Sequence, residues 1–277
     1  MSSRLRAIAR ETVEIIERGN YRTPDGEVVL GEQVARAVEA TRLYLPEESV
    51  TVAAPVSAVS PRVQVTNESS LAAARRLGGA VACLVFASAR NPGGGFLNGA
   101  QAQEESLARS SALYPCLRAA DEFYAYHRSH PELTYSDRVI YSPAVPVFRD
   151  DDARLLADPF PVSFLTAAAP NRGAMARTQP EYLPDLRAVL TRRATRILAI
   201  AAAHGHRRIV LGAWGCGVFG NDPAEVATAF AAALRAQPWF DDVVFAVLDR
   251  QADAPTFTAF ARVHGAVSPP GTATAQR

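Results

Sequence analysis

Glu104 and Glu105 are adjacent carboxylates at the start of a predicted helix, directly after the glycine-rich loop 91–100. On a helix with about 3.6 residues per turn their side chains point about 100° apart, so the two cannot share one role. One carboxylate can donate a proton to a reacting bond while its neighbour holds a substrate hydroxyl, as in glycoside hydrolysis. Taken alone, the pair is also explained by the preference of acidic residues for a first helical turn. Together with the glycine loop it indicates an acid–base site.

The residues before this loop predict a buried strand. Residues 81–87 are continuously apolar and rich in strand-forming types, which is typical of a parallel sheet covered on both faces. Gly93, Gly94 and Gly95 therefore follow the carboxyl end of a strand, where open α/β sheets bind ligands. Glycines permit positive φ and let the backbone approach a ligand closely. A tight turn without a ligand is the alternative.

A second unit of strand, glycine-rich loop and helix lies further along the chain. Residues 208–211 predict a buried strand, and Asp222 followed by Pro223 predicts the start of a helix. The loop 212–221 between them exposes backbone N–H groups ahead of a helix N-terminus, which suits a diphosphate. It has neither a Walker motif nor a good dinucleotide fingerprint, which disfavours triphosphate hydrolysis with magnesium and nicotinamide chemistry.

The remaining pattern predicts the elements that position these loops. Helices are expected at 4–17, 68–77 and 184–204, the last two ended by Gly78 and Gly205. Short strands are expected at 63–66, 139–141, 145–148 and 162–165. Four prolines in the middle section predict irregular or edge pairing there: Pro143, Pro146, Pro159 and Pro161. The small, polar, proline-bearing segment 266–277 predicts a disordered tail.

Gly-Gly-Gly, seven residues, then Gln-Glu-Glu at 103–105 resembles the signature of the poly(ADP-ribose) glycohydrolases. The surrounding residues 86–100 resemble the bacterial branch of that family, and the order of segments over 63–261 agrees with it. The resemblance implies an α/β fold, a three-layer α/β/α macrodomain-like sandwich with a mixed, largely parallel sheet. It also implies a single domain over 1–265, with an N-terminal helical extension over residues 1–60.

The resemblance implies a role for residues of both loops. Glu105 matches the catalytic residue, which protonates the leaving ribose oxygen and then activates water, and Glu104 matches the residue that orients the ribose. Phe219 matches an aromatic residue that packs against the terminal ribose, with an ordinary core phenylalanine as the alternative. The other expected substrate-binding residues are Gly93, Gly94, Gly95, Asn98, Gln103, Gly215, Cys216, Gly217, Val218 and Gly220.

The activity implied by the resemblance is hydrolysis of ribose–ribose O-glycosidic bonds in poly(ADP-ribose), from the chain end, with release of ADP-ribose. Poly(ADP-ribose) or ADP-ribosylated proteins would be the substrates, in the reversal of ADP-ribosylation during a bacterial DNA damage response. Two other functions stay open: a reader that binds ADP-ribose without cutting it, and a hydrolase of mono-ADP-ribose on protein side chains. The glutamate pair favours an enzyme, since a reader needs no proton donor.

Composition and charge narrow the classes of function. At 48% hydrophobic and 21% charged residues the chain has the composition of a globular protein, and its apolar runs are too short to span a membrane. A net charge of +1 argues against binding nucleic acid through phosphate neutralisation. An odd count of cysteines without CxxC or a signal peptide predicts unpaired thiols and a cytoplasmic location. The histidines and Asp150–Asp152 lack the spacing of metal ligands, so neither a metal nor a cofactor is expected.

Overall fold

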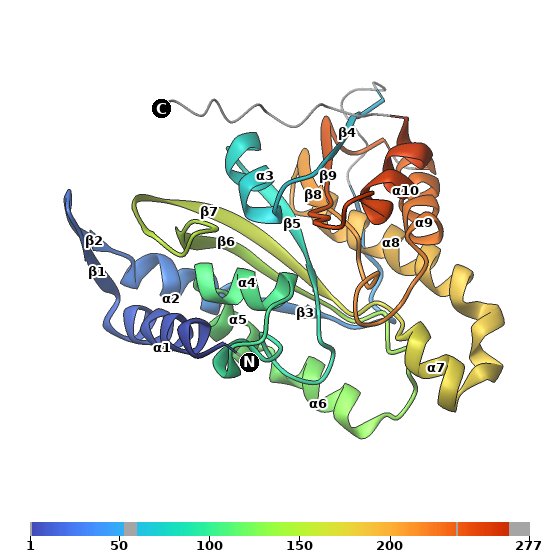
Figure 1. Ribbon diagram of the computed structural model, residues 1–277, viewed down its shortest axis with the longest axis horizontal. Coiled ribbons are helices and arrows are strands. Elements are labelled where there is room, and N and C mark those ends of the chain that lie inside the picture. Colours follow the sequence, from blue (N-terminus) through green and yellow to red (C-terminus); the bar gives the residue numbers. More distant parts are fainter. Residues whose placement is uncertain (1, 53–59, 237, 266–277) are drawn as a thin grey trace.

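The computed structural model describes residues 2–52, 60–236 and 238–265 and is built around one seven-stranded sheet (Figure 1). The strand order is β3–β6–β7–β5–β8–β9–β4. The five parallel strands are β7 (Leu155–Ala167), β5 (Val81–Phe86), β8 (Arg208–Leu211), β9 (Asp242–Ala246) and β4 (Arg62–Thr66). At the other edge β6 (Val139–Arg149) is antiparallel to β7, and β3 (Arg42–Tyr44) is antiparallel to β6. The mixed, largely parallel sheet that the sequence predicts is confirmed.

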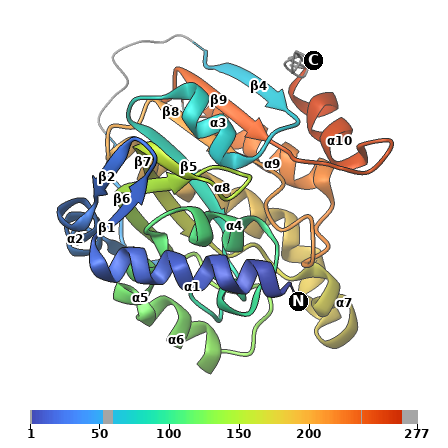
Figure 2. The same ribbon diagram turned by 60° about the vertical axis from the view of Figure 1, so that its left-hand side comes forward.

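Helices cover both faces of this sheet, so the molecule has three layers (Figures 1 and 2). One face carries α1 (Ser3–Arg18), α2 (Gly31–Glu39), α3 (Ser70–Leu77), α4 (Gln103–Ser110), α5 (Leu113–Ala119) and α6 (Asp121–Ser129). The other face carries α7 (Arg172–Thr178), α8 (Leu186–Ala203), α9 (Pro223–Ala236) and α10 (Pro255–His264). Two short 3₁₀ helices, η1 (Phe96–Asn98) and η2 (Pro180–Asp185), precede α4 and α8.

Strand β5 lies in the middle of the sheet and is buried on both sides. Val81, Cys83 and Val85 belong to the core on one face, whereas Ala82 and Leu84 belong to the core on the other. Because successive side chains of a strand point to opposite faces, a strand covered on both faces needs apolar residues at every position. This explains the continuous apolar run and confirms the predicted strand.

Most predicted elements are confirmed to within a few residues, and the middle section differs in two respects. The strand predicted at 162–165 begins seven residues earlier, as β7. The predicted strands 139–141 and 145–148 form a single strand, β6, whose register against β7 shifts between Ser142 and Val145. Strand β3 pairs with residues 139–141, so the later part of β6 lies at the edge of the sheet, where Ser111 forms an isolated bridge with Val147. Pro146 and Pro161 stand opposite each other in that part. The prediction of irregular edge pairing is therefore confirmed.

The first sixty residues contain strands as well as the expected helices. Strands β1 (Asn20–Thr23) and β2 (Gly26–Val29) form a separate hairpin, and β3 joins the main sheet. Strands this short show too few alternations for their period to be read from sequence. The predicted tail 266–277 lies outside the described residues. None of the helices in the described ranges is both long enough and apolar enough to cross a membrane.

Arg193 in α8 is a fully buried cation that links two segments at one edge of the sheet. Its Nε donates to Asp137 Oδ1 at 2.9 Å, and its Nη1 donates to the carbonyl oxygens of Thr134 at 3.0 Å and Ala168 at 2.7 Å. A buried guanidinium is tolerated only when its donors are paired in this way. Arg193 thus ties the segment after α6 to the end of β7.

The two neighbouring arginines give a matched test of this link. We expect Arg193→Met to lower the free energy of unfolding by about 3–5 kcal/mol, because the carbonyls of Thr134 and Ala168 lose their donor and Asp137 loses its buried partner. Arg192, whose side chain is 57% exposed, also pairs with Asp137, and Arg192→Met should cost less than about 1 kcal/mol. Urea unfolding followed by circular dichroism measures both. Equal losses would contradict the assigned role of Arg193.

Candidate active site

Two glycine-rich loops begin side by side at the carboxyl edge of the sheet. β5 and β8 are adjacent parallel strands, so the loop 87–102 after β5 and the loop 212–222 after β8 leave the sheet at neighbouring points (Figure 1). β7, on the other side of β5, ends at the same edge. The topology therefore brings together two loops that are more than a hundred residues apart in sequence.

Glu104, in the first turn of α4, is a buried carboxylate at the base of the first loop. Its side chain is 2% exposed, and Oε2 accepts a 2.7 Å hydrogen bond from the Ser88 N–H. Within the part of the chain that the structure describes, Oε1 has no partner. Burial raises the pKa of Glu104 to about 8, against the opposing effect of the Ser88 and Gly93 amides and with a further increase from the Glu105 charge. Glu104 is therefore predominantly neutral at pH 7 in the free protein.

Glu105 is half-buried, and a different part of the same loop holds its side chain. Its Oε1 accepts a 3.0 Å hydrogen bond from the Gly95 N–H. A Cβ on Gly94 would collide with this oxygen and lie 2.9 Å from the Glu105 Cδ and 3.3 Å from the Glu104 Oε2. Gly94 also has φ of +59°, which glycine alone adopts at little cost. Both carboxylates thus pack against a backbone that has no side chain.

Gln103 anchors the start of α4 to the sheet. Its Oε1 accepts from the Phe86 N–H at 2.9 Å, and its Nε2 donates to Leu84 O at 2.8 Å and to Ser70 Oγ at 3.1 Å. These bonds fix the position of the two glutamates that follow. The amide already has three protein partners, so the predicted contact of Gln103 with substrate stays a prediction. Asn98, also predicted to bind substrate, is exposed in η1.

The second loop presents free backbone amides. Among the described residues, the N–H groups of Gly217, Val218 and Phe219 have no acceptor. Val218 is 93% exposed, whereas Phe219 is half-buried and its ring lies 5.8 Å from that of Tyr135. Consecutive unpaired amides next to the N-terminus of α9 form an anion-binding surface. The role of this loop in diphosphate binding stays a prediction, which these free amides support.

Cys216 in the same loop does not have the properties of a nucleophile. Burial and, to a lesser extent, the charge of the nearby Asp222 raise the pKa of its thiol to about 12. A nucleophilic cysteine requires a lowered pKa, so the thiolate is not available here. Across residues 2–52, 60–236 and 238–265, no group of three or more His, Cys, Asp or Glu side chains is placed to hold a metal ion.

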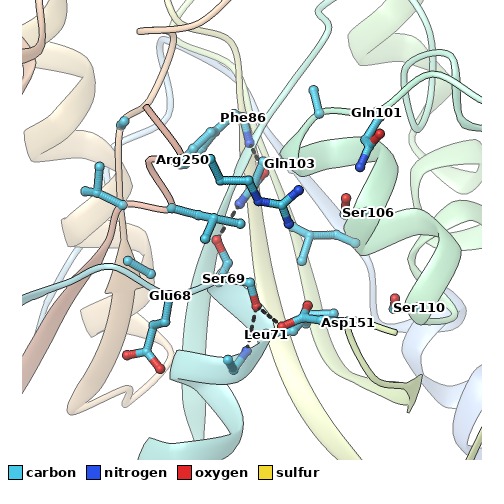
Figure 3. A pocket seen from close by; sticks show the side chains of 18 of the residues that line it. Glu68, Ser69, Leu71, Phe86, Gln101, Gln103, Ser106, Ser110, Asp151 and Arg250 are labelled. Carbon is cyan, nitrogen blue, oxygen red and sulfur yellow. Dashed lines mark hydrogen bonds between the residues drawn. The ribbon is translucent and has the colours of Figure 1, made fainter. Parts of the chain in front are cut away.

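A cleft of about 1000 Å³ extends from the second loop into the groove between α3 and α4. Cys216 and Gly217 line it at one end, and Gln103 and Ser106 line the α4 side, on either side of the glutamate pair in sequence. The two glutamates do not themselves line this cleft but lie next to it. Figure 3 shows the Arg250 side chain reaching from the β9–α10 loop into the middle of the cleft.

Sequence reasoning missed the side chain that braces the first loop from behind. Arg109 is 6% exposed, its Nη1 donates to Ala100 O at 2.6 Å, and its backbone oxygen accepts from Thr12 Oγ1 at 2.7 Å. Arg109 lies one helical turn after Glu105. This spacing of four residues between a Glu and an Arg is the sequence signal that could have identified it. The partner Thr12 comes from α1, which runs alongside α4 in Figure 2, and that contact had no signal in the sequence.

Comparison with known proteins identifies the family. The model described as "Microbial-type PARG, catalytic domain" matches residues 9–150. A crystal structure of poly(ADP-ribose) glycohydrolase (PARG) from Thermomonospora curvata is 52% identical, with a TM-score of 0.88, and the match covers 95% of this chain and 100% of that one. The same enzyme bound to the inhibitor ADP-HPD is 53% identical, with a TM-score of 0.86 and coverage of 94% and 99%.

A second bacterial enzyme gives the same result. Poly(ADP-ribose) glycohydrolase from Deinococcus radiodurans in complex with ADP-ribose is 45% identical, with a TM-score of 0.77, covering 88% of this chain and 98% of that one. The search of curated proteins gave no match. The layered fold with two loops at one sheet edge is macrodomain-like. Within that class the chain belongs to the microbial-type poly(ADP-ribose) glycohydrolases, which are glycoside hydrolases, and the resemblance read from the sequence is confirmed.

The raised pKa of Glu104 predicts a specific pH dependence of stability. The ordinary pKa is 4.5 and the folded value is about 8, so between these values the unfolded chain loses a proton that the folded protein keeps. Stability from this group therefore falls as pH rises from 4.5 to 8. We expect the melting temperature of Glu104→Gln, relative to wild type, to increase over that interval and then level off. A constant difference from pH 4 to 9, measured against the exposed control Glu122→Gln, would contradict the burial argument.

The contact between Gly94 and the carboxylates predicts the effect of a single methyl group. We expect Gly94→Ala to displace Glu105 and to reduce the turnover rate by about 100-fold or more, because misplacing a catalytic group by about 1 Å has that effect. Gly217→Ala is the control for folding, since a Cβ there meets nothing within 4 Å and should leave the melting temperature unchanged. A Gly94→Ala variant with wild-type turnover would refute the assigned geometry.

Proposed function

We propose that this protein hydrolyses ribose–ribose O-glycosidic bonds of poly(ADP-ribose) from the chain end and releases ADP-ribose, which is ADP-ribosylation reversal. The observation that carries the proposal is the glutamate pair held by one loop, next to a second loop with three free amides. The solved relatives support it, because one is bound to ADP-HPD and another to ADP-ribose. Membership of a DNA damage response in bacteria fits this activity.

The substrate would lie along the carboxyl edge of the sheet. We place its diphosphate on the amides of residues 217–219, with Arg250 as a flexible cation nearby. The terminal ribose would then lie between Gly93–Gly95 and Phe219, within reach of the glutamates. The adenosine would occupy the cleft between α3 and α4, which is large enough for it. In this arrangement backbone amides supply most of the binding to the diphosphate, which agrees with a net charge of only +1 for the chain.

In this arrangement Glu105 is the general acid and base. The Gly95 N–H fixes its Oε1, which leaves Oε2 to donate a proton to the leaving ribose oxygen as the C1–O bond breaks. The resulting carboxylate then takes a proton from the water that attacks the anomeric carbon. One side chain serves both steps, and the products are ADP-ribose and a polymer shortened by one unit.

Glu104 has a different task because its environment differs. A carboxyl group with a pKa of about 8 is neutral near pH 7, and it can both donate to and accept from a ribose hydroxyl. Its neutral state also spares Glu105 a negative neighbour, so the charge that develops on Glu105 during the reaction is not opposed. Two adjacent glutamates thus take different roles because their environments differ.

We also propose that residues 1–265 act as a single domain and that the protein works in the cytoplasm. Strand β3 of the N-terminal segment pairs with the main sheet, and α1 contacts the catalytic loop, which supports one folding unit. In the described ranges Cys83, Cys116 and Cys216 are free thiols, which fits a reducing compartment.

The test is release of ADP-ribose by wild type and by Glu105→Gln from a poly(ADP-ribosyl)ated acceptor. We expect wild type to shorten the polymer, and we expect the variant to turn over about 10² to 10⁴ times more slowly while binding ADP-ribose with unchanged affinity. Glu122→Gln, on the exposed side of α6, controls for loss of a surface charge. Full turnover by Glu105→Gln would overturn the assignment.

The same experiment separates the two other functions. A protein that binds ADP-ribose but releases none from any acceptor is a reader. A protein that acts only on a mono-ADP-ribosylated acceptor is a hydrolase of the protein linkage. The glutamate pair argues against the reader, because binding alone needs no proton donor such as Glu105.

A further inference from the structure

Asn221 is a buried amide at the base of the second glycine-rich loop, where the loop joins α9. Its side chain is 2% exposed and lies one residue before Asp222, whose Oδ1 caps the helix by accepting from the N–H groups of Ala224 and Glu225. The capping residue accounts for the start of the helix. It does not account for the asparagine before it.

The bonds of Asn221 all converge on the loop and its surroundings. Its backbone N–H and its side-chain Nδ2 both donate to the Gly215 carbonyl, each at 3.1 Å. The same Nδ2 donates to Pro170 O at 2.8 Å, just after the end of β7. Two carbonyl acceptors on Nδ2 also fix which end of the amide is nitrogen. Asn221 therefore closes residues 215–221 into a ring and fastens that ring to the sheet edge.

Gly215 is adapted to this closure. It has φ of +72°, and a Cβ there would lie 2.5 Å from Asn221 Nδ2 and would also collide with the Ala169 Cβ. Inside the ring, the Gly220 N–H donates to Gly217 O at 2.9 Å, and the Gly173 N–H of α7 donates to Phe219 O at 2.9 Å. The carbonyls of Gly215, Gly217 and Phe219 thus accept hydrogen bonds, while the amides of residues 217–219 are free.

The stability of the fold does not by itself explain an asparagine at this position. Among the residues that the structure describes, its Oδ1 is buried and has no partner. An unpaired buried acceptor costs free energy, and this offsets part of what the two Nδ2 bonds contribute. A role in binding is the reason that remains for keeping the amide.

We propose that Asn221 is a positioning residue for the substrate diphosphate: by closing the ring it holds the amides of residues 217–219 in an orientation that binds one anion. The proposal rests on the proposed function, since it assigns that loop to the diphosphate of ADP-ribose. Donors fixed in advance bind without an ordering cost at the moment of binding. Asn221 does not touch the substrate, and its effect passes through the backbone of the ring.

The test compares Asn221→Asp with Asn171→Asp. The first change keeps the shape but replaces Nδ2 with an oxygen that faces two carbonyl oxygens. Asn171 caps α7 through Oδ1, which accepts from the Ala174 N–H at 3.1 Å, so Asn171→Asp adds the same charge nearby and keeps its bond. Affinity for ADP-ribose is measured by titration calorimetry, affinity for adenosine by ligand-observed NMR, and KM and kcat with the polymer.

For Asn221→Asp we expect the Kd of ADP-ribose and the KM to rise about tenfold or more, since each lost hydrogen bond commonly has an effect of that size. The Kd of adenosine should stay within about twofold, and kcat should fall less than KM rises, because the amides bind ground state and transition state alike. Asn171→Asp should change none of these. If Asn221→Asp does not fold, Asn221→Ser, which is smaller and keeps one donor, should show a smaller change in the same direction.

The outcomes distinguish this proposal from the proposed function. An unchanged Kd for ADP-ribose in a folded Asn221 variant would overturn the positioning role even if wild type releases ADP-ribose. Parallel loss of adenosine affinity would also overturn it, since that shows general damage to the cleft. A wild type that binds ADP-ribose without releasing it refutes the hydrolase, and a selective loss of ADP-ribose affinity in Asn221→Asp would still support the positioning role.

Discussion

The burial of the Glu104 carboxylate is the constraint on which the rest of the site depends. A carboxylate cannot be removed from water cheaply, and it must either find hydrogen bonds or take up a proton. Glu104 does both, with the Ser88 N–H on one oxygen and a pKa raised to about 8. The loop before Glu104 and helix α4, which carries it, must therefore keep fixed positions relative to each other. Gln103 fixes the start of α4 through its bonds to β5 and α3.

The N-terminal segment extends the same support to the far side of the loop. Arg109 holds the loop at Ala100, Thr12 of α1 donates to the Arg109 backbone, and Arg149 at the end of β6 donates to Thr12 at 3.2 Å. All three side chains are nearly or fully buried. A chain of buried polar contacts of this kind has few alternative arrangements, because each unmet donor or acceptor is costly. The N-terminal segment therefore helps to hold the catalytic loop in place.

The sequence predicted those features that follow from local chemistry. A strand with both faces covered, a helix with a capping aspartate, and two glycine loops each have a pattern within ten or fifteen residues, and β5, α9 and both loops lie where that pattern indicates. What the sequence could not show is the result of pairing between distant segments. The hairpin β1–β2 and strand β3 are too short to have a readable period, and Thr12, Arg193 and Asn221 make contacts with residues up to 137 positions away.

The sequence also could not show how the environments of the two adjacent glutamates differ, because neighbours on a helix have nearly identical local chemistry. The difference arises in three dimensions. Glu104 is buried beneath the first glycine loop, while Glu105 is half-buried and accepts a hydrogen bond from the Gly95 amide. Successive residues of a helix point about 100° apart, so the two adjacent glutamates lie in different surroundings. A one-residue shift of α4 would move both carboxyl groups out of these two environments, so the three bonds of Gln103 that set the start of α4 also set the chemistry of the site.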